Sequence, residues 1–218
     1  MKVEIWSDVV CPWCYLGKRR FEQALDGFAH RDEVDVVYRS FELDPSAARG
    51  TTAPTVEVLA GKYGMTPEQA ADAQRQMEAR AREDGLTFAM SDLRSGNTRD
   101  AHRLLHRAAE HGVQADLVER LHRAYFTESR SVFDTDSLAD LAAEAGLDRA
   151  TAAAVLAGDD YDDAVAEDEA LARTFGVTGV PFFVIDRTYG VSGAQSAAVL
   201  SDVLDQIRQK TIQEEQAS

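Results

Sequence analysis

Strand-forming segments lie only near the two ends of this chain, and this division limits the folds that it can adopt. A first strand is predicted just before the cysteine pair, with a helix after that pair and a second strand close behind. Near the C-terminus, two further strands precede a helix that Ser196 caps. The two units can share one sheet, because insertions are tolerated where chain ends lie close together. The predicted strands are residues 2–6, 34–41, 180–186 and 191–193.

The segment between these units, residues 54–175, is helical in pattern almost throughout. Thr66 begins a capping box with Pro67 at the first helical position, and Gly85 marks the end of that helix. We therefore predict an α/β fold that carries a large inserted all-helical domain. The predicted boundaries are residues 1–50 and 176–210 for the α/β domain, 51–175 for the insertion, and 211–218 for a polar tail, with fraying expected from Gln209 onward.

Charge and length exclude several classes of function. The chain has 23 Lys and Arg against 38 Asp and Glu, a formal net charge of −15, which disfavours binding to nucleic acids. The same balance disfavours a polybasic contact with membranes, and no apolar run approaches the length of a membrane span. The N-terminus shows no secretory signal, so we expect a cytoplasmic protein. In that compartment, paired cysteines are typical of catalysis or metal binding.

The two cysteines stand in the motif Cys11-Pro12-Trp13-Cys14, between a predicted strand and a predicted helix. Cys11 is expected at the helix N-terminus, where free N–H groups and the helix dipole favour the thiolate. Cys14 follows one turn later, so it can attack a mixed disulfide held on Cys11 and act as the resolving thiol. We expect an exposed Cys11 sulfur and a less accessible Cys14. The motif therefore predicts thiol–disulfide exchange.

Metal binding is the main alternative for such a cysteine pair, and the sequence gives it little support. A structural zinc site needs four ligands, and none of the five histidines has zinc-finger spacing to Cys14. His102 and His106 share one helix face, but the arginines beside them oppose a cation. We therefore expect no metal site and no tightly bound cofactor.

A second motif, Gly176-Val-Thr-Gly-Val-Pro-Phe-Phe-Val184, places Pro181 at the start of a predicted strand. Together with the segments 7–14, 41–45 and 190–195, this motif resembles the DsbA family of the thioredoxin superfamily, in particular its FrnE-like cytosolic branch. The resemblance covers about residues 2–208. It implies a thioredoxin-like fold with an inserted helical domain, and disulfide oxidoreductase activity. It also implies a cis Val180–Pro181 bond that leaves the backbone of Val180 free to pair with an extended substrate.

Two residues depart from the pattern of relatives. Many thioredoxin-fold oxidoreductases carry a buried acid six residues before the first cysteine, where this chain has Ile5. Asp8 is a candidate acceptor for the proton of Cys14, and a cap on the active-site helix is its alternative role. Trp13 stands where strongly oxidising periplasmic relatives have His, which predicts a less oxidising couple.

The candidate substrate-binding residues lie in both parts of the chain. We expect Trp13 at the edge of the substrate groove, with packing under the helical domain as the alternative. Asn97 fits a helix N-cap as well as a substrate ligand, and His102 fits a surface position as well as the cleft. The full set of candidates is Pro12, Trp13, Val180, Asn97 and His102.

The leading hypothesis is a cytosolic thiol–disulfide oxidoreductase with Cys11, Cys14 and Pro181 as its catalytic residues. The alternative is a glutathione-dependent isomerase of the 2-hydroxychromene-2-carboxylate type or a kappa-class transferase, but those enzymes usually carry Ser at the first cysteine position. A third hypothesis is a binding or chaperone module without catalysis. The expected partners are thiols or disulfides of proteins or small molecules. Glutathione is a candidate co-substrate, and we expect a monomer or a homodimer.

Overall fold

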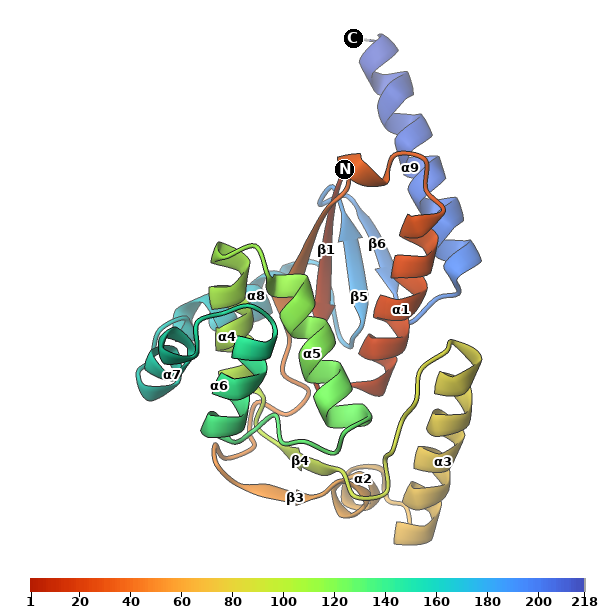
Figure 1. Ribbon diagram of the computed structural model, residues 1–218. Coiled ribbons are helices and arrows are strands. Elements are labelled where there is room, and N and C mark those ends of the chain that lie inside the picture. The colour runs from red at the N-terminus through yellow and green to blue at the C-terminus, as the bar shows by residue number, and fades with distance from the viewer. Residues whose placement is uncertain (218) are drawn as a thin grey trace.

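The two ends of the chain build one mixed sheet, as the sequence predicts. The computed structural model describes residues 1–217. Its central strands are β1 (Lys2–Ser7), β2 (Asp35–Ser40), β5 (Phe182–Ile185) and β6 (Tyr189–Ser192). The order across the sheet is β2-β1-β5-β6, with β1 parallel to β2 and antiparallel to β5 (Figure 1). This pairing brings the segment before the cysteines beside the segment after Pro181.

Successive side chains of each strand point to opposite faces of the sheet, and both faces are buried. Val3 and Ile5 of β1 belong to the main core, together with residues of α1 (Pro12–Asp26) and α9 (Ala197–Ala217). Trp6 points the other way and packs in a second cluster with residues of α8 (Asp162–Thr174). Helices α1 and α9 lie side by side (Figure 1). The sheet therefore lies between two helical layers, and β1 leads directly to the N-terminal end of α1.

The insertion contains helices and one short β ribbon. Strands β3 (Thr52–Pro54) and β4 (Arg94–Gly96) pair antiparallel, so the prediction of an all-helical insertion missed this ribbon. Strands of three residues are too short to show a clear alternation. Helix α8, the last helix of the predicted insertion, packs on the sheet as well as on another helix of the insertion. The other helices are α2 (Thr55–Tyr63), α3 (Pro67–Glu83), α4 (Arg99–Glu110), α5 (Gln114–Phe126), α6 (Thr135–Glu144) and α7 (Arg149–Ala157).

Helix α3 starts and stops where the sequence predicts. The Thr66 hydroxyl accepts a hydrogen bond from the backbone N of Gln69 at 3.2 Å, and the Gln69 side chain accepts one from the backbone N of Thr66 at 2.9 Å. This capping box satisfies two N–H groups at the helix start. Gly85 follows the helix with φ of 75°, a conformation that costs glycine little.

The C-terminal segment differs from its prediction. The polar tail from Gln209 was expected to fray, but α9 continues through Ala217. The segment 197–217 contains neither Gly nor Pro, and its Gln, Glu and Lys residues are good helix formers, so the helix continues. Figure 1 shows the last turns of α9 extending beyond the sheet. The final predicted tail residue, Ser218, lies outside the described residues.

Buried charges join the sheet to α8. Glu4 is fully buried and pairs with Arg39 and Arg187. Arg39 also pairs with Asp168 of α8 at an Nη1–Oδ1 distance of 3.0 Å, and Asp168 accepts a hydrogen bond from the backbone N of Ser40 at 2.9 Å. Burial alone favours the neutral carboxyl, but hydrogen bonds and charge from the two arginines lower the pKa of Glu4 on balance. Glu4 and Arg39 are therefore charged at neutral pH.

Candidate active site

Cys11 occupies the N-cap position of α1, at the end of the loop that follows β1. Its backbone N donates to the carbonyl of Asp8 at 3.1 Å, and its own carbonyl accepts from the backbone N of Cys14 at 3.0 Å. Pro12 is the first helical residue, and within the described part of the chain no side chain caps this helix start. Cys11 therefore stands at the positive end of the dipole of α1, a position that reactive cysteines commonly occupy.

Both cysteines are buried free thiols, with 4% of Cys11 and 2% of Cys14 exposed. The expectation of an exposed Cys11 sulfur is therefore wrong, and the carbonyl of Val180 lies against that sulfur. Burial, followed by the hydrogen bond and charge of Cys11, raises the pKa of Cys14 well above its ordinary value. Cys14 is thus held as a neutral thiol behind Cys11.

The loop before β5 closes over the cysteine pair. The Val180–Pro181 peptide bond is cis, and the Cys11 thiol donates to the carbonyl of Val180 with an Sγ–O distance of 3.7 Å. Gly17 of α1 allows this approach, because a Cβ there would lie only 2.7 Å from Cγ of Pro181. Two distant segments therefore meet at the candidate nucleophile.

The Gly17 contact gives a testable expectation. Gly17→Ala should destabilise the protein by about 1–3 kcal/mol, because the added methyl group overlaps Pro181 and the loop has to move. It should also slow any reaction of Cys11 that needs this loop. Urea denaturation and thiol alkylation rates measure the two effects.

Gly61→Ala is the matched control, because Gly61 also lies inside a helix but has open space around it. There the better helix propensity of alanine should stabilise the protein by up to about 1 kcal/mol. Equal responses of the two variants would contradict the steric role of Gly17.

A cavity of about 930 Å³ opens beside Cys11. Residues of α1, the Pro181 loop, α2, α3 and the β3–β4 ribbon line it, so both parts of the fold contribute walls. Trp13 stands at this cavity with 37% of its surface exposed, and Arg80 of α3 lies over its ring at 5.1 Å from the centroid. The cysteine site is thus the end of a large pocket rather than an isolated pair.

The structure brings most of the sequence-predicted residues to this cavity, but not all of them. Pro12, Trp13 and Val180 line it together with Cys11. Asn97 is outside the lining, where its side chain donates to Glu42 and to the carbonyl of Ala47 and accepts from the backbone N of Arg99. The helix-cap interpretation of Asn97 is the closer one, since that last bond lies at the start of α4. His102 is also outside the lining and is buried.

Asp8 was only partly understood from the sequence. Its carboxylate does not cap α1, but accepts a hydrogen bond from the backbone N of Leu43 at 2.8 Å and lies 3.3 Å from Nε2 of His102. Asp8 lines the cavity and is 1% exposed. No individual residue of the wall formed by α2 and α3 is predicted from the sequence, because no local pattern shows which helix face turns toward a cysteine far away in the sequence.

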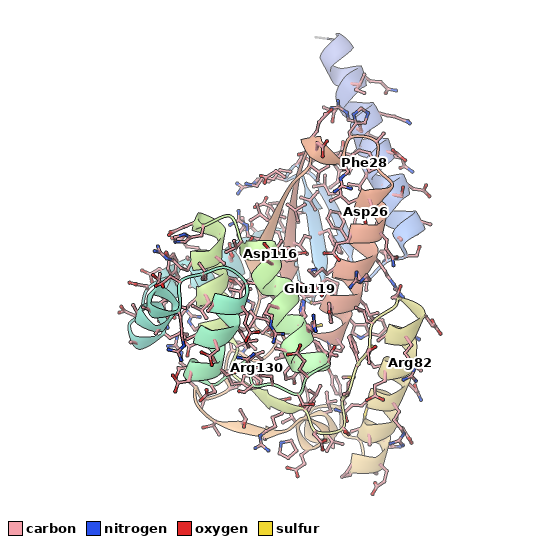
Figure 2. All side chains as sticks on the ribbon, in the orientation of Figure 1. Asp26, Phe28, Arg82, Asp116, Glu119 and Arg130 are labelled. Carbon is pink, nitrogen blue, oxygen red and sulfur yellow. The ribbon has the colours of Figure 1, made fainter. Side chains whose placement is uncertain are left out.

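His122 lies beside the loop that contains Asp8 and packs among aromatic side chains. It stacks on Tyr15 with ring centroids 4.9 Å apart, and its Nε2 lies 3.4 Å from the carbonyl oxygen of Asp8. Nearby, Lys18 and Tyr15 of α1 contact Glu119, which Figure 2 labels on α5. Burial, followed by the charge of Lys18, lowers the pKa of His122 from 6.5 to about 4.

This shift predicts a loss of stability in acid. Between pH 6.5 and about 4 the unfolded chain binds a proton at His122 that the folded protein does not, so stability falls as the pH falls through that window. The loss should reach about 3 kcal/mol. His122→Phe should flatten the dependence, as measured by urea denaturation at pH 7.5, 5.5 and 4.5. Parallel pH profiles for the two proteins would contradict this assignment.

Among residues 1–217, no group of three or more His, Cys, Asp or Glu side chains is arranged to hold a metal ion. In the same part of the chain, no helix combines the length and apolar character needed to cross a bilayer.

Comparison with known proteins identifies the family. The family model of the DSBA-like thioredoxin domain matches residues 2–205, and the chain belongs to this family. The solved structure of a probable DsbA oxidoreductase from Streptomyces coelicolor is 50% identical, with a TM-score of 0.91 over 94% of this chain and 89% of that chain. The predicted resemblance to the DsbA family and the predicted α/β fold are thereby confirmed.

Two more distant structures share the fold. One is the cytosolic disulfide reductase DsbM from Pseudomonas aeruginosa with GSH, at 21% identity and a TM-score of 0.62 over 95% of this chain and 100% of that chain. The other is a 2-hydroxychromene-2-carboxylate isomerase, at 17% identity and a TM-score of 0.69 over 98% of each chain. The fold therefore occurs in a disulfide reductase and in an isomerase.

Proposed function

We propose that this protein is a cytosolic thiol–disulfide oxidoreductase in which Cys11 is the nucleophile and Cys14 the resolving thiol. The observation that carries the proposal is the place of Cys11, at an uncapped helix start and in the lining of a large cavity. The burial and raised pKa of Cys14 suit a thiol that reacts only with a neighbouring mixed disulfide. Membership of the DSBA-like family and the likeness to cytosolic DsbM support the same activity and location.

The reaction that follows has two exchange steps. The Cys11 thiolate attacks one sulfur of a substrate disulfide, the substrate S–S bond breaks, and the leaving thiolate takes up a proton. The Cys14 thiolate then attacks Sγ of Cys11, releases the second substrate thiol and leaves a Cys11–Cys14 disulfide. Two electrons pass from the enzyme to the substrate. Glutathione is the proposed co-substrate that returns the pair to the dithiol, and the reverse sequence oxidises a dithiol.

The Pro181 loop is proposed to hold the substrate during these steps. The carbonyl of Val180 lies beside Cys11, so an extended segment that pairs with this backbone places its sulfur next to the nucleophile. Trp13 and Pro12 form the adjoining rim of the cavity. Asn97 and His102 are proposed to support the site from behind, through Glu42 and Asp8.

Reduction of insulin and of a small disulfide, with glutathione as the reductant, tests this function. We expect turnover by the unaltered protein and only the uncatalysed exchange rate with Cys11→Ser. A biological function that persists unchanged in Cys11→Ser would exclude the redox role and favour a binding or chaperone module.

A glutathione-dependent isomerase or transferase is the second candidate. The fold shared with 2-hydroxychromene-2-carboxylate isomerase over 98% of each chain favours it. The two thiols at the helix start favour redox chemistry, since the isomerase reaction needs only bound glutathione. Tight glutathione binding without any disulfide reductase or oxidase activity would decide for the isomerase.

A further inference from the structure

The cavity beside Cys11 is larger and more apolar than exchange between sulfur atoms requires. Apolar side chains of the insertion form part of its lining, namely Val58 and Leu59 of α2, Met77 of α3, and Met90 and Leu93 before β4. Its volume of about 930 Å³ lies at the upper end of the roughly 300–1,000 Å³ typical of sites for small organic molecules. The pocket can therefore enclose much of a molecule whose sulfur reaches Cys11.

The lining offers one hydrogen-bond donor that has no partner. Gln74 of α3 lines the cavity and is only 5% exposed. Its Nε2 is buried and makes no hydrogen bond to any residue that the structure describes. An unpaired buried amide is costly, so an acceptor supplied from the cavity would be favourable.

The carboxylates of the lining are already engaged. Asp8 lies 3.3 Å from His102 and accepts from a backbone N, and Glu42 pairs with Arg99 at 3.0 Å. Asp44 accepts from the hydroxyl and the backbone N of Ser46. They are therefore held by protein partners and do not call for a cationic ligand. The apolar surface, the buried Gln74 donor and the exposed Lys62 ammonium remain to select what enters.

We propose that the substrates of this site are small-molecule thiols or disulfides whose group on sulfur is apolar and ends in a neutral hydrogen-bond acceptor that meets Gln74. This inference rests on the proposed function and names its substrate class. Cys11 exchanges with the sulfur of the molecule, and the apolar body occupies the space between α1, α2 and α3. Residues from both parts of the fold line this space.

Alkyl methanethiosulfonates test the proposal on the full-length Cys14→Ser variant. Each reagent transfers its alkylthio group to the Cys11 thiolate with loss of methanesulfinate, and mass spectrometry follows the mixed disulfide. Rates are divided by those of 2-mercaptoethanol in solution, which removes the intrinsic reactivity of each reagent. We expect the hexyl reagent to exceed the methyl reagent at least roughly 20-fold after this correction, because its chain is buried in the cavity.

Two matched substitutions locate the effect. Ala73→Trp places a large side chain in the cavity lining and should lower the hexyl-to-methyl ratio about tenfold. Ala79→Trp on the same helix is the control, since Ala79 is exposed and outside the lining.

The role of Gln74 is tested with a second reagent, whose alkyl chain matches the hexyl chain but ends in a carboxamide. Gln74→Leu should lower the carboxamide-to-hexyl ratio about tenfold.

The outcomes separate this proposal from the proposed function. A Cys11 that reacts with the methyl reagent no faster than 2-mercaptoethanol would overturn the redox function itself. A reactive Cys11 with equal corrected rates for methyl and hexyl reagents would overturn only the substrate class. Equal hexyl-to-methyl ratios in Ala73→Trp and Ala79→Trp would also overturn the substrate class. A carboxamide ratio unaffected by Gln74→Leu would remove the role of Gln74.

Discussion

Cys14→Ser is expected to hold its substrate in a stable mixed disulfide on Cys11, whereas Cys11→Ser should capture nothing. The nucleophile remains at the helix start in the first variant, but the thiol that releases the product is gone. Mass spectrometry of the protein after incubation with a disulfide reads out the adduct directly. Turnover of both variants should fall to the uncatalysed rate.

The release step should also depend on pH in a defined direction. Burial raises the pKa of Cys14, and this effect remains when Cys11 is in a mixed disulfide and carries no charge. Because the thiolate is the attacking form, release should accelerate by about tenfold per pH unit between pH 6 and 8. Stopped-flow measurement of product release in the unaltered protein checks this slope. A flat profile, or an adduct on Cys14 in the Cys11→Ser variant, would reverse the assigned roles.

Arg39→Met should destabilise the protein by about 3–5 kcal/mol. This is the largest loss of stability that we expect from the removal of a single charge. The substitution keeps an apolar stem but leaves the buried carboxylates of Glu4 and Asp168 without their shared cation. Urea denaturation at neutral pH measures the loss. Adding Glu4→Gln to this variant should restore part of it, because one uncompensated charge disappears.

Arg187→Met is the control for this prediction. Arg187 also pairs with Glu4, but its side chain is 59% exposed, so its loss should cost no more than about 1 kcal/mol. The lowered pKa of Glu4 sets the pH range of this effect. The stability that the Glu4 carboxylate contributes is fully present above pH 4.5, its ordinary pKa, and is lost as the pH falls through its pKa in the folded protein. Equal losses for the two arginine variants would contradict a buried origin of the effect.

Local patterns predicted the parts of this structure that depend on neighbouring residues. The capping box at Thr66 and the strand–Cys11–helix junction could be read because their determinants lie within a few residues. The pairing of β1 with β5 could be inferred only by joining two separate motifs. In the site, Trp13 and Val180 were found because they adjoin such motifs.

The remaining features depend on tertiary packing. The β3–β4 ribbon needs contacts across the insertion that three-residue strands do not reveal. Gln74 lies in an ordinary helical sequence, and only its place in the lining of the cavity gives it a proposed role. Burial of the Cys11 sulfur was missed for the same reason, since the covering residues come from distant segments. The length of α9 was underestimated because polarity was taken as a sign of fraying.

The pairing of β1 with β5 has a consequence for biosynthesis. Val3 of β1 lies opposite Ile185, so the central sheet cannot close until residue 185 has left the ribosome. Until then the nascent polypeptide carries Cys11 and Cys14 without the Val180 loop that covers them. Ribosome-bound intermediates should therefore expose both thiols to alkylation, and protection should appear only after the C-terminal hairpin emerges from the exit tunnel.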